Sequence, residues 1–177
     1  RPGAPPGAVV SAVALLDARE VAAQVTDPEM PMLTLADLGV LREVDRDGDR
    51  VTVTITPTYS GCPAMATMRD DLERALLRAG YAEVTVRVSL SPAWSSDWIT
   101  EVGREALRAH GLSAPGPVDA PSGGPVALTL LRTRRALTCP RCGSDATELV
   151  SEFGATACKA MYRCTDCAEP FEHVKEI

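Results

Sequence analysis

Two Cys-x2-Cys pairs near the end of the chain constrain its fold more than any other feature. The pairs are Cys139 with Cys142 and Cys164 with Cys167. Four thiolates in two such pairs are typical of a closed tetrahedral zinc site, which leaves no open position for water. A segment of roughly 40 residues is also too small to fold well without a metal site of this kind. The sequence therefore predicts a C-terminal ribbon with structural zinc, although four cysteines also hold iron in rubredoxin-like sites or in iron-sulfur clusters.

Of the two remaining cysteines, Cys62 lies where an alternating strand runs through a tight turn into a helix. The stretch reads Thr56-Pro57-Thr58-Tyr59-Ser60-Gly61-Cys62-Pro63. We expect Pro63 at the first helical position, so that the helix dipole favours the thiolate of Cys62, the nucleophilic and metal-binding form. The alternative is a half-buried cysteine that caps a turn.

Cys158 precedes Cys164 by six residues and, by strand alternation, shares a face with it. It is either a core thiol of that strand or a contact residue at a partner surface or at a second metal. The sequence leaves both interpretations open.

Hydrophobic periodicity predicts the element order α-β-β-α-β-α before the cysteine-rich segment. Helices are expected from residues 11, 63 and 95–96, and strands over 40–44, 51–55 and 84–90. The expected fold class is therefore α+β, with a small three-stranded mixed sheet packed by helices, plus a C-terminal zinc-ribbon domain.

Segments rich in proline and glycine divide the chain. We expect a flexible lead over residues 1–10, the α+β domain over 11–111, a linker over 112–125 and the four-cysteine zinc ribbon over 126–177.

The net charge and the hydropathy of the chain argue against nucleic acid and membranes as partners. The net charge is −6 and the pI is near 5.0, which gives no general attraction to nucleic acid or to an anionic membrane surface. No apolar run approaches the roughly 20 residues that cross a bilayer, and residues 8–16 make a poor signal peptide. We expect a cytoplasmic protein in which cysteines are metal ligands or reactive thiols before they are disulfides.

The chain lacks the usual constellations of an oxygenase or a reductase. Its two histidines are His110 and His173, it has no Glu-x-x-His pair, and it has no glycine-rich nucleotide loop. We therefore expect neither the oxygen-activating nor the electron-supplying subunit of a redox complex.

Two stretches carry a family resemblance. Asp27-Pro28-Glu29, the hairpin over 40–55 and the Cys62 stretch resemble the SufT-like family of small iron-sulfur assembly factors. The run from Phe153 to Cys164, continued by Cys167-Ala-Glu-Pro-Phe171, resembles the PaaD (PaaJ) family of phenylacetate-degradation proteins. The resemblance implies an accessory role with the oxygenase or iron-sulfur reductase subunits of phenylacetyl-CoA 1,2-epoxidase, in maturation of an iron-sulfur or iron centre.

The resulting hypothesis is that Cys62 is a transient thiolate ligand for iron or an iron-sulfur cluster. Asp27 and Glu29 lie near it to orient, to add ligation or to accept protons. Two alternatives stay open: a non-catalytic structural subunit of the oxygenase complex, and a thiol enzyme that uses Cys62 with a neighbouring base. An exposed edge of the small sheet is a plausible surface for a homodimer.

Overall fold

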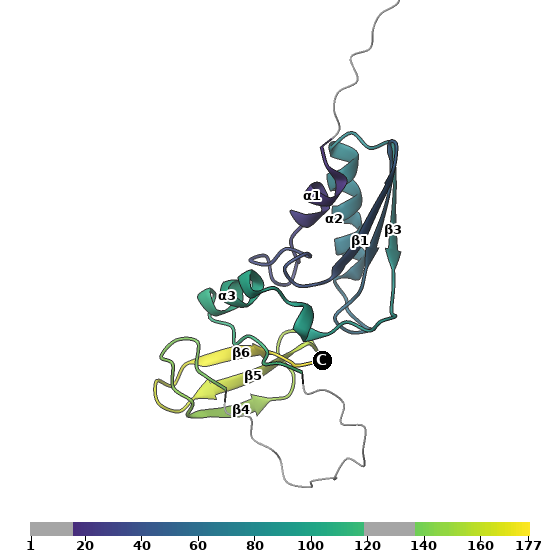
Figure 1. The fold of residues 1–177 in the computed structure, drawn as a ribbon. Coiled ribbons are helices and arrows are strands. Elements are labelled where there is room, and N and C mark those ends of the chain that lie inside the picture. The colour runs from purple at the N-terminus through teal and green to yellow at the C-terminus, as the bar shows by residue number, and fades with distance from the viewer. Residues whose placement is uncertain (1–15, 119–136) are drawn as a thin grey trace, which may run out of the picture.

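The computed structural model of the protein describes residues 16–118 and 137–177 (Figure 1). The predicted lead, the predicted helix start at residue 11 and the second part of the predicted linker lie outside these residues. The elements are α1 (Ala18–Ala23), β1 (Leu41–Asp47), β2 (Arg50–Ile55), α2 (Met65–Arg78), β3 (Glu83–Val88), the 3-10 helix η1 (Ser96–Trp98), α3 (Glu101–Ala109), β4 (Thr147–Ser151), β5 (Lys159–Cys164) and β6 (Pro170–Val174). This order confirms the predicted α+β class.

The first sheet has the order β1-β2-β3 and is mixed, as predicted. The central strand β2 pairs antiparallel with β1 and parallel with β3. Its alternation buries Val51, Val53 and Ile55 in the core that also holds Met68 and Leu72 of α2. Figure 1 shows α1 and α2 together on one side of this sheet.

Two helix starts differ from the prediction. The helix α2 begins at Met65, so Pro63 lies in the preceding turn, where the N–H of Cys62 bonds the carbonyl of Tyr59 at 3.2 Å. The helix predicted from residues 95–96 is split into η1 and α3, because Ile99 has an extended backbone. Thr100 then caps α3 by accepting the N–H of Gly103 at 3.0 Å.

The second sheet is the antiparallel ribbon β4-β5-β6, which confirms the predicted zinc-ribbon fold. Its own core is small and consists of Cys139, Cys164 and Phe171, with Tyr162 packed against them. A core of this size needs the metal that its cysteines can hold.

The ribbon packs directly against the first module. Ser113, in the predicted linker, forms a parallel bridge with His173 of β6. The N–H of Ser96 bonds the carbonyl of Ile177 at 3.0 Å, and Val174 of β6 is buried in the larger core. In Figure 1 the ribbon accordingly lies below α3 and the lower end of the first module. Within the described residues, no helix is long and apolar enough to cross a membrane.

Candidate functional site

The four paired cysteines converge as their spacing predicts. The sulfur atoms of Cys139, Cys142, Cys164 and Cys167 all lie within 4.8 Å of one another. The Sγ atoms are 3.8 Å apart for Cys139 and Cys167, and 3.6 Å apart for Cys142 and Cys164. A tetrahedral zinc ion with bonds of about 2.3 Å separates its sulfur ligands by about 3.8 Å. The residues therefore fit a zinc ion.

Backbone geometry supports each cysteine pair. The residue after each pair has a left-handed backbone, with φ of +75° at Gly143 and +62° at Ala168. Backbone N–H groups of Cys167 and Asp166 lower the pKa of Cys164 to about 7 against the effect of burial. Such N–H groups favour a thiolate at the position where the metal binds.

The predicted residues Cys62, Asp27 and Glu29 meet around a separate, small cavity of about 20 Å³. A cavity of this size holds one water-sized particle. Its lining comes from three places, namely the Asp27 loop, the turn before α2 and the ribbon. The lining residues are Asp27, Glu29, Met30, Thr58, Tyr59, Cys62, Pro63, Ala64, Thr156 and Cys158.

Asp27 is buried and fixes the shape of its loop. Its Oδ1 accepts the N–H groups of Glu29 and Met30, each at 2.8 Å. This is the short-range bonding by which aspartate closes a turn. Burial raises the pKa of Asp27 even though these two bonds lower it. Glu29, by contrast, is exposed and lies at the rim.

The expectation that Cys62 favours the thiolate is wrong for the protein without a bound cation. Burial raises the pKa of the Cys62 thiol, and the nearby Asp27, Cys158 and Glu29 raise it further. The N–H of Ala64 opposes this rise without reversing it. Burial, with a smaller contribution from the acidic groups, therefore outweighs the effect of the helix start that follows Cys62.

Cys158 is the residue at this cavity whose role the sequence leaves open. It lies just before β5 rather than within the strand, so alternation with Cys164 does not place it. Its sulfur is 3.0 Å from the hydroxyl oxygen of Thr156. The signal in the sequence is a cysteine outside both pairs, in the short run Gly-Ala-Thr-Ala-Cys.

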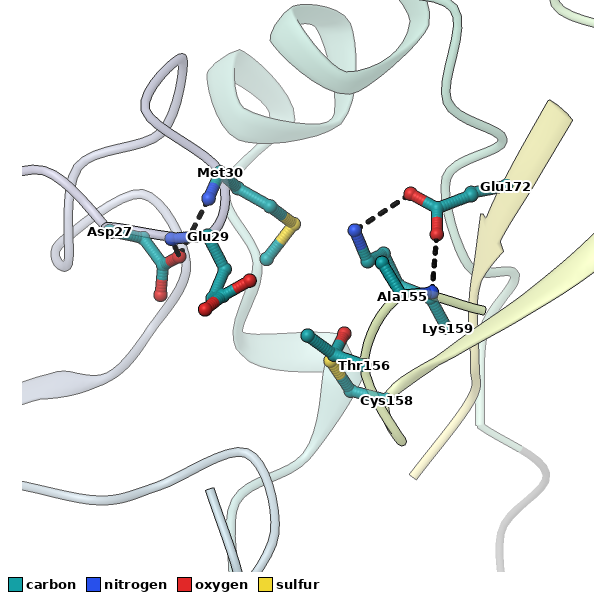
Figure 2. Close-up of polar contacts among 8 residues, drawn as sticks. All are labelled: Asp27, Glu29, Met30, Ala155, Thr156, Cys158, Lys159 and Glu172. Carbon is teal, nitrogen blue, oxygen red and sulfur yellow. Dashed lines mark hydrogen bonds and ion pairs between the residues drawn. The ribbon is translucent and has the colours of Figure 1, made fainter. Parts of the chain in front are cut away.

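The segment that carries Cys158 is held by the ribbon (Figure 2). Glu172 Oε1 accepts the N–H of Ala155 at 2.9 Å, and its Oε2 lies 2.7 Å from the ammonium of Lys159. The carbonyl of Cys158 accepts the N–H of Lys175 at 2.9 Å. Figure 2 shows the Asp27–Met30 loop facing Thr156 and Cys158 across the junction of the two modules.

The two cysteine sites differ in how closely their ligand atoms converge. Among the described residues, only the four ribbon cysteines form a group of three or more metal-ligating side chains with all ligand atoms within 4.8 Å. The side chains around the small cavity do not form such a group.

The histidines lie elsewhere. His110 is exposed at the end of α3, and its Nδ1 is 2.8 Å from the carbonyl of Ala106. His173 is buried, with its Nδ1 3.1 Å from the hydroxyl of Ser113. Neither lines the cavity at Cys62, so a cysteine–histidine pair is absent from this site.

Sequence comparisons match both parts of the chain. Residues 17–90 match the family "Iron-sulfur cluster assembly protein", and residues 123–175 match the "PaaD zinc beta ribbon domain". A protein of Escherichia coli (strain K12), provisionally named as one of the subunits of 1,2-phenylacetyl-CoA epoxidase, is 43% identical over 154 residues, which is 87% of this chain and 88% of that protein.

A second relative resembles the first module. The "Fe-S protein maturation auxiliary factor YitW" of Bacillus subtilis (strain 168) is 33% identical over 86 residues, covering 48% of this chain and 83% of that protein. A crystal structure of a domain of unknown function from Bacillus anthracis covers 51% of this chain and 87% of its own, with 26% identity and a TM-score of 0.47.

Proposed function

The chain belongs to the family of this Escherichia coli subunit of 1,2-phenylacetyl-CoA epoxidase, and from this premise we propose that it is an accessory protein that helps to assemble the iron-sulfur or iron centre of that oxygenase. The name of the Bacillus subtilis relative, a maturation auxiliary factor for iron-sulfur proteins, supports assembly rather than catalysis. The protein would act on the oxygenase or the iron-sulfur reductase as its client.

One observation carries this proposal. Cys62, Asp27 and Glu29 come from two separate loops, yet all three line one small cavity. A thiolate together with carboxylate oxygens is a mixed donor set that suits a divalent transition metal such as Fe²⁺. Burial and the nearby acidic groups raise the pKa of the Cys62 thiol, and a cation that enters among these groups would stabilise their ionised forms.

The contrast between the two cysteine sites also supports a role in which the protein passes a metal ion on to a client. The ribbon cysteines are already within ligating distance of one ion, which is the property of a permanent structural site. The ligands around the cavity are not preassembled, and a site that must reorganise binds more weakly and releases more readily. Cargo would therefore be held at Cys62 and zinc in the ribbon.

The cavity is too small for the organic substrate of an oxygenase. Sites for small organic ligands measure about 300–1,000 Å³, whereas the cavity at Cys62 measures about 20 Å³. The residues at this cavity therefore serve an inorganic cargo rather than phenylacetyl-CoA.

The test is reconstitution of the epoxidase complex in cells that carry Cys62→Ser in place of the wild type. We expect a complex with lowered iron content and lowered epoxidase activity. The matched control is Ser60→Ala, an exposed change in the same turn that does not line the cavity. Normal iron content with Cys62→Ser, together with stable co-purification, would instead favour the structural-subunit alternative.

A further inference from the structure

We propose that Cys158 is a second thiolate ligand at the Cys62 cavity, so that the zinc ribbon and the first module together bind one divalent metal ion. This inference rests on the proposed function, since it names the cargo and completes the ligand set of the same site. It assigns the ribbon a role beyond its structural zinc.

The position of Cys158 is the first argument. It lines the same cavity as Cys62, Asp27 and Glu29, although it belongs to the other module. The sulfur already contacts a hydroxyl, that of Thr156, at 3.0 Å. A hydroxyl at this distance can donate to a thiolate and stabilise it once a metal has displaced the proton.

The second argument is that the ribbon holds this segment firmly. Glu172 binds the N–H of Ala155, and the N–H of Gly154 bonds the carbonyl of Lys159 at 2.7 Å. A Cβ on Gly154 would lie 2.6 Å from Glu172 Oε1, so a larger residue there would displace the carboxylate that holds Ala155. A ligand on an anchored segment keeps its position relative to the partner ligand on the other module.

The volume of the cavity decides between a single metal ion and an iron-sulfur cluster as the cargo. A volume of about 20 Å³ accepts one ion or one water. The core of even the smaller iron-sulfur cluster contains two irons and two sulfides. The cavity therefore has room for a single ion but not for a cluster.

The chemistry of the thiolates and carboxylates at the cavity indicates which metal ion the site would bind. Two thiolates neutralise one divalent cation, and the carboxylates of Asp27 and Glu29 offer oxygen ligands beside them. Sulfur with oxygen favours iron, cobalt or zinc over calcium or magnesium. Given the proposed function, Fe²⁺ is the expected cargo.

Titration with Co²⁺ under argon tests the inference, followed by the same titration with Fe²⁺. The full chain is first loaded with one equivalent of zinc, which the four-thiolate ribbon holds in preference to cobalt. Thiolate-to-Co²⁺ charge-transfer absorption then reports how many thiolates bind the second ion. We expect one further equivalent in the wild type, with absorption reduced by about half in Cys62→Ser and in Cys158→Ser, and abolished in the double variant.

The outcomes separate this inference from the proposed function. Full absorption in Cys158→Ser with a loss in Cys62→Ser overturns the second thiolate and leaves Cys62 as a carrier. No second equivalent in the wild type, or equal binding in all variants, overturns both. Binding of an assembled cluster in place of one ion overturns the single-ion cargo.

Two controls show whether a loss of metal binding reflects a lost ligand or a loss of folding. Ala157→Ser changes the same exposed segment without touching a thiol and should bind as the wild type. Zinc content and the unfolding temperature of Cys158→Ser should match those of the wild type, because Cys158 is not a ribbon ligand. The two serine variants therefore report ligation alone.

Discussion

The ammonium of Lys159 lies 2.7 Å from Oε2 of Glu172, and the Lys159 side chain is only 6% exposed. The second carboxylate oxygen of Glu172 accepts the N–H of Ala155. Burial alone would raise the pKa of Glu172, but the Ala155 bond and Lys159 lower it below its usual value. One ion pair therefore fastens the segment that carries Cys158 to the ribbon.

Breaking this pair should loosen the segment. Glu172→Gln leaves a buried ammonium without its counter-charge, and we expect a loss of about 2 kcal/mol in the free energy of unfolding. Alkylation of Cys158 should become faster. The measurements are denaturant unfolding and mass-spectrometric labelling, with the double variant Lys159→Met/Glu172→Gln as the control that recovers most of the loss. An unchanged unfolding midpoint for Glu172→Gln would contradict the anchoring role.

Gly154→Ala tests the same attachment of the Cys158 segment to the ribbon, because Gly154 also lies against Glu172. The new Cβ would lie 2.6 Å from Glu172 Oε1 and 3.2 Å from the Cβ of Lys159, so the carboxylate must move. We expect destabilisation of about 1–3 kcal/mol. At Gly116, a Cβ would lie 3.5 Å from Glu176 Oε1, an ordinary contact, and Gly116→Ala is the matched control with little effect. Equal unfolding temperatures for the two variants would show that Glu172 is free to shift.

The Glu176 carboxylate should make the fold sensitive to acid. Burial by itself would raise the pKa of Glu176, but bonds from His173 and from the N–H of Gly116 lower it to about 2. A lowered folded-state pKa gives stability that is present above the unfolded value of about 4.3 and is lost as the pH falls toward 2. The full effect is on the order of 2–3 kcal/mol.

Urea unfolding between pH 2 and pH 5 checks this expectation. Glu176→Gln should be less stable than the wild type at pH 5, and the two should converge near pH 2. Glu148→Gln removes an exposed ion pair with Arg163 and should leave the pH dependence of the wild type nearly intact. Parallel curves for Glu176→Gln and the wild type would refute the assignment to Glu176.

Removal of zinc should unfold the ribbon before the first module. Among the residues that the structure describes, the ribbon core consists of Cys139, Cys164 and Phe171 with Tyr162 packed against them, whereas the first sheet and its helices share a large core. Hydrogen exchange after chelation should show loss of protection in β4–β6 and retained protection in β1–β3. Protection that persists in β5 without metal would mean that the ribbon folds on its own contacts.

Features that depend on residues close together in the sequence can be predicted from the spacing of those residues. The ribbon ligands are predictable because each pair lies within one tight turn, and the structure places all four sulfurs together. The β1–β2 hairpin is predictable because the two strands are joined by a turn with Gly48 at φ +63°. The split between η1 and α3 escapes prediction because Thr100 is fixed by Asp37, a residue far away in the sequence, whose Oδ1 accepts the Thr100 hydroxyl at 3.0 Å.

The sequence by itself determined the element order and the two cysteine pairs that converge in the ribbon, because these follow from periodicity and local turns, whereas the grouping of Asp27 and Glu29 with Cys62 was implied by the family resemblance. Only the tertiary structure decided the protonation of Cys62 and the place of Cys158. Both depend on long-range packing, which buries the Cys62 thiol and brings Cys158 of the ribbon and the acids of the Asp27 loop to one cavity, and burial together with these groups raises the pKa of the Cys62 thiol. Such long-range contacts arise from packing, which no local pattern encodes.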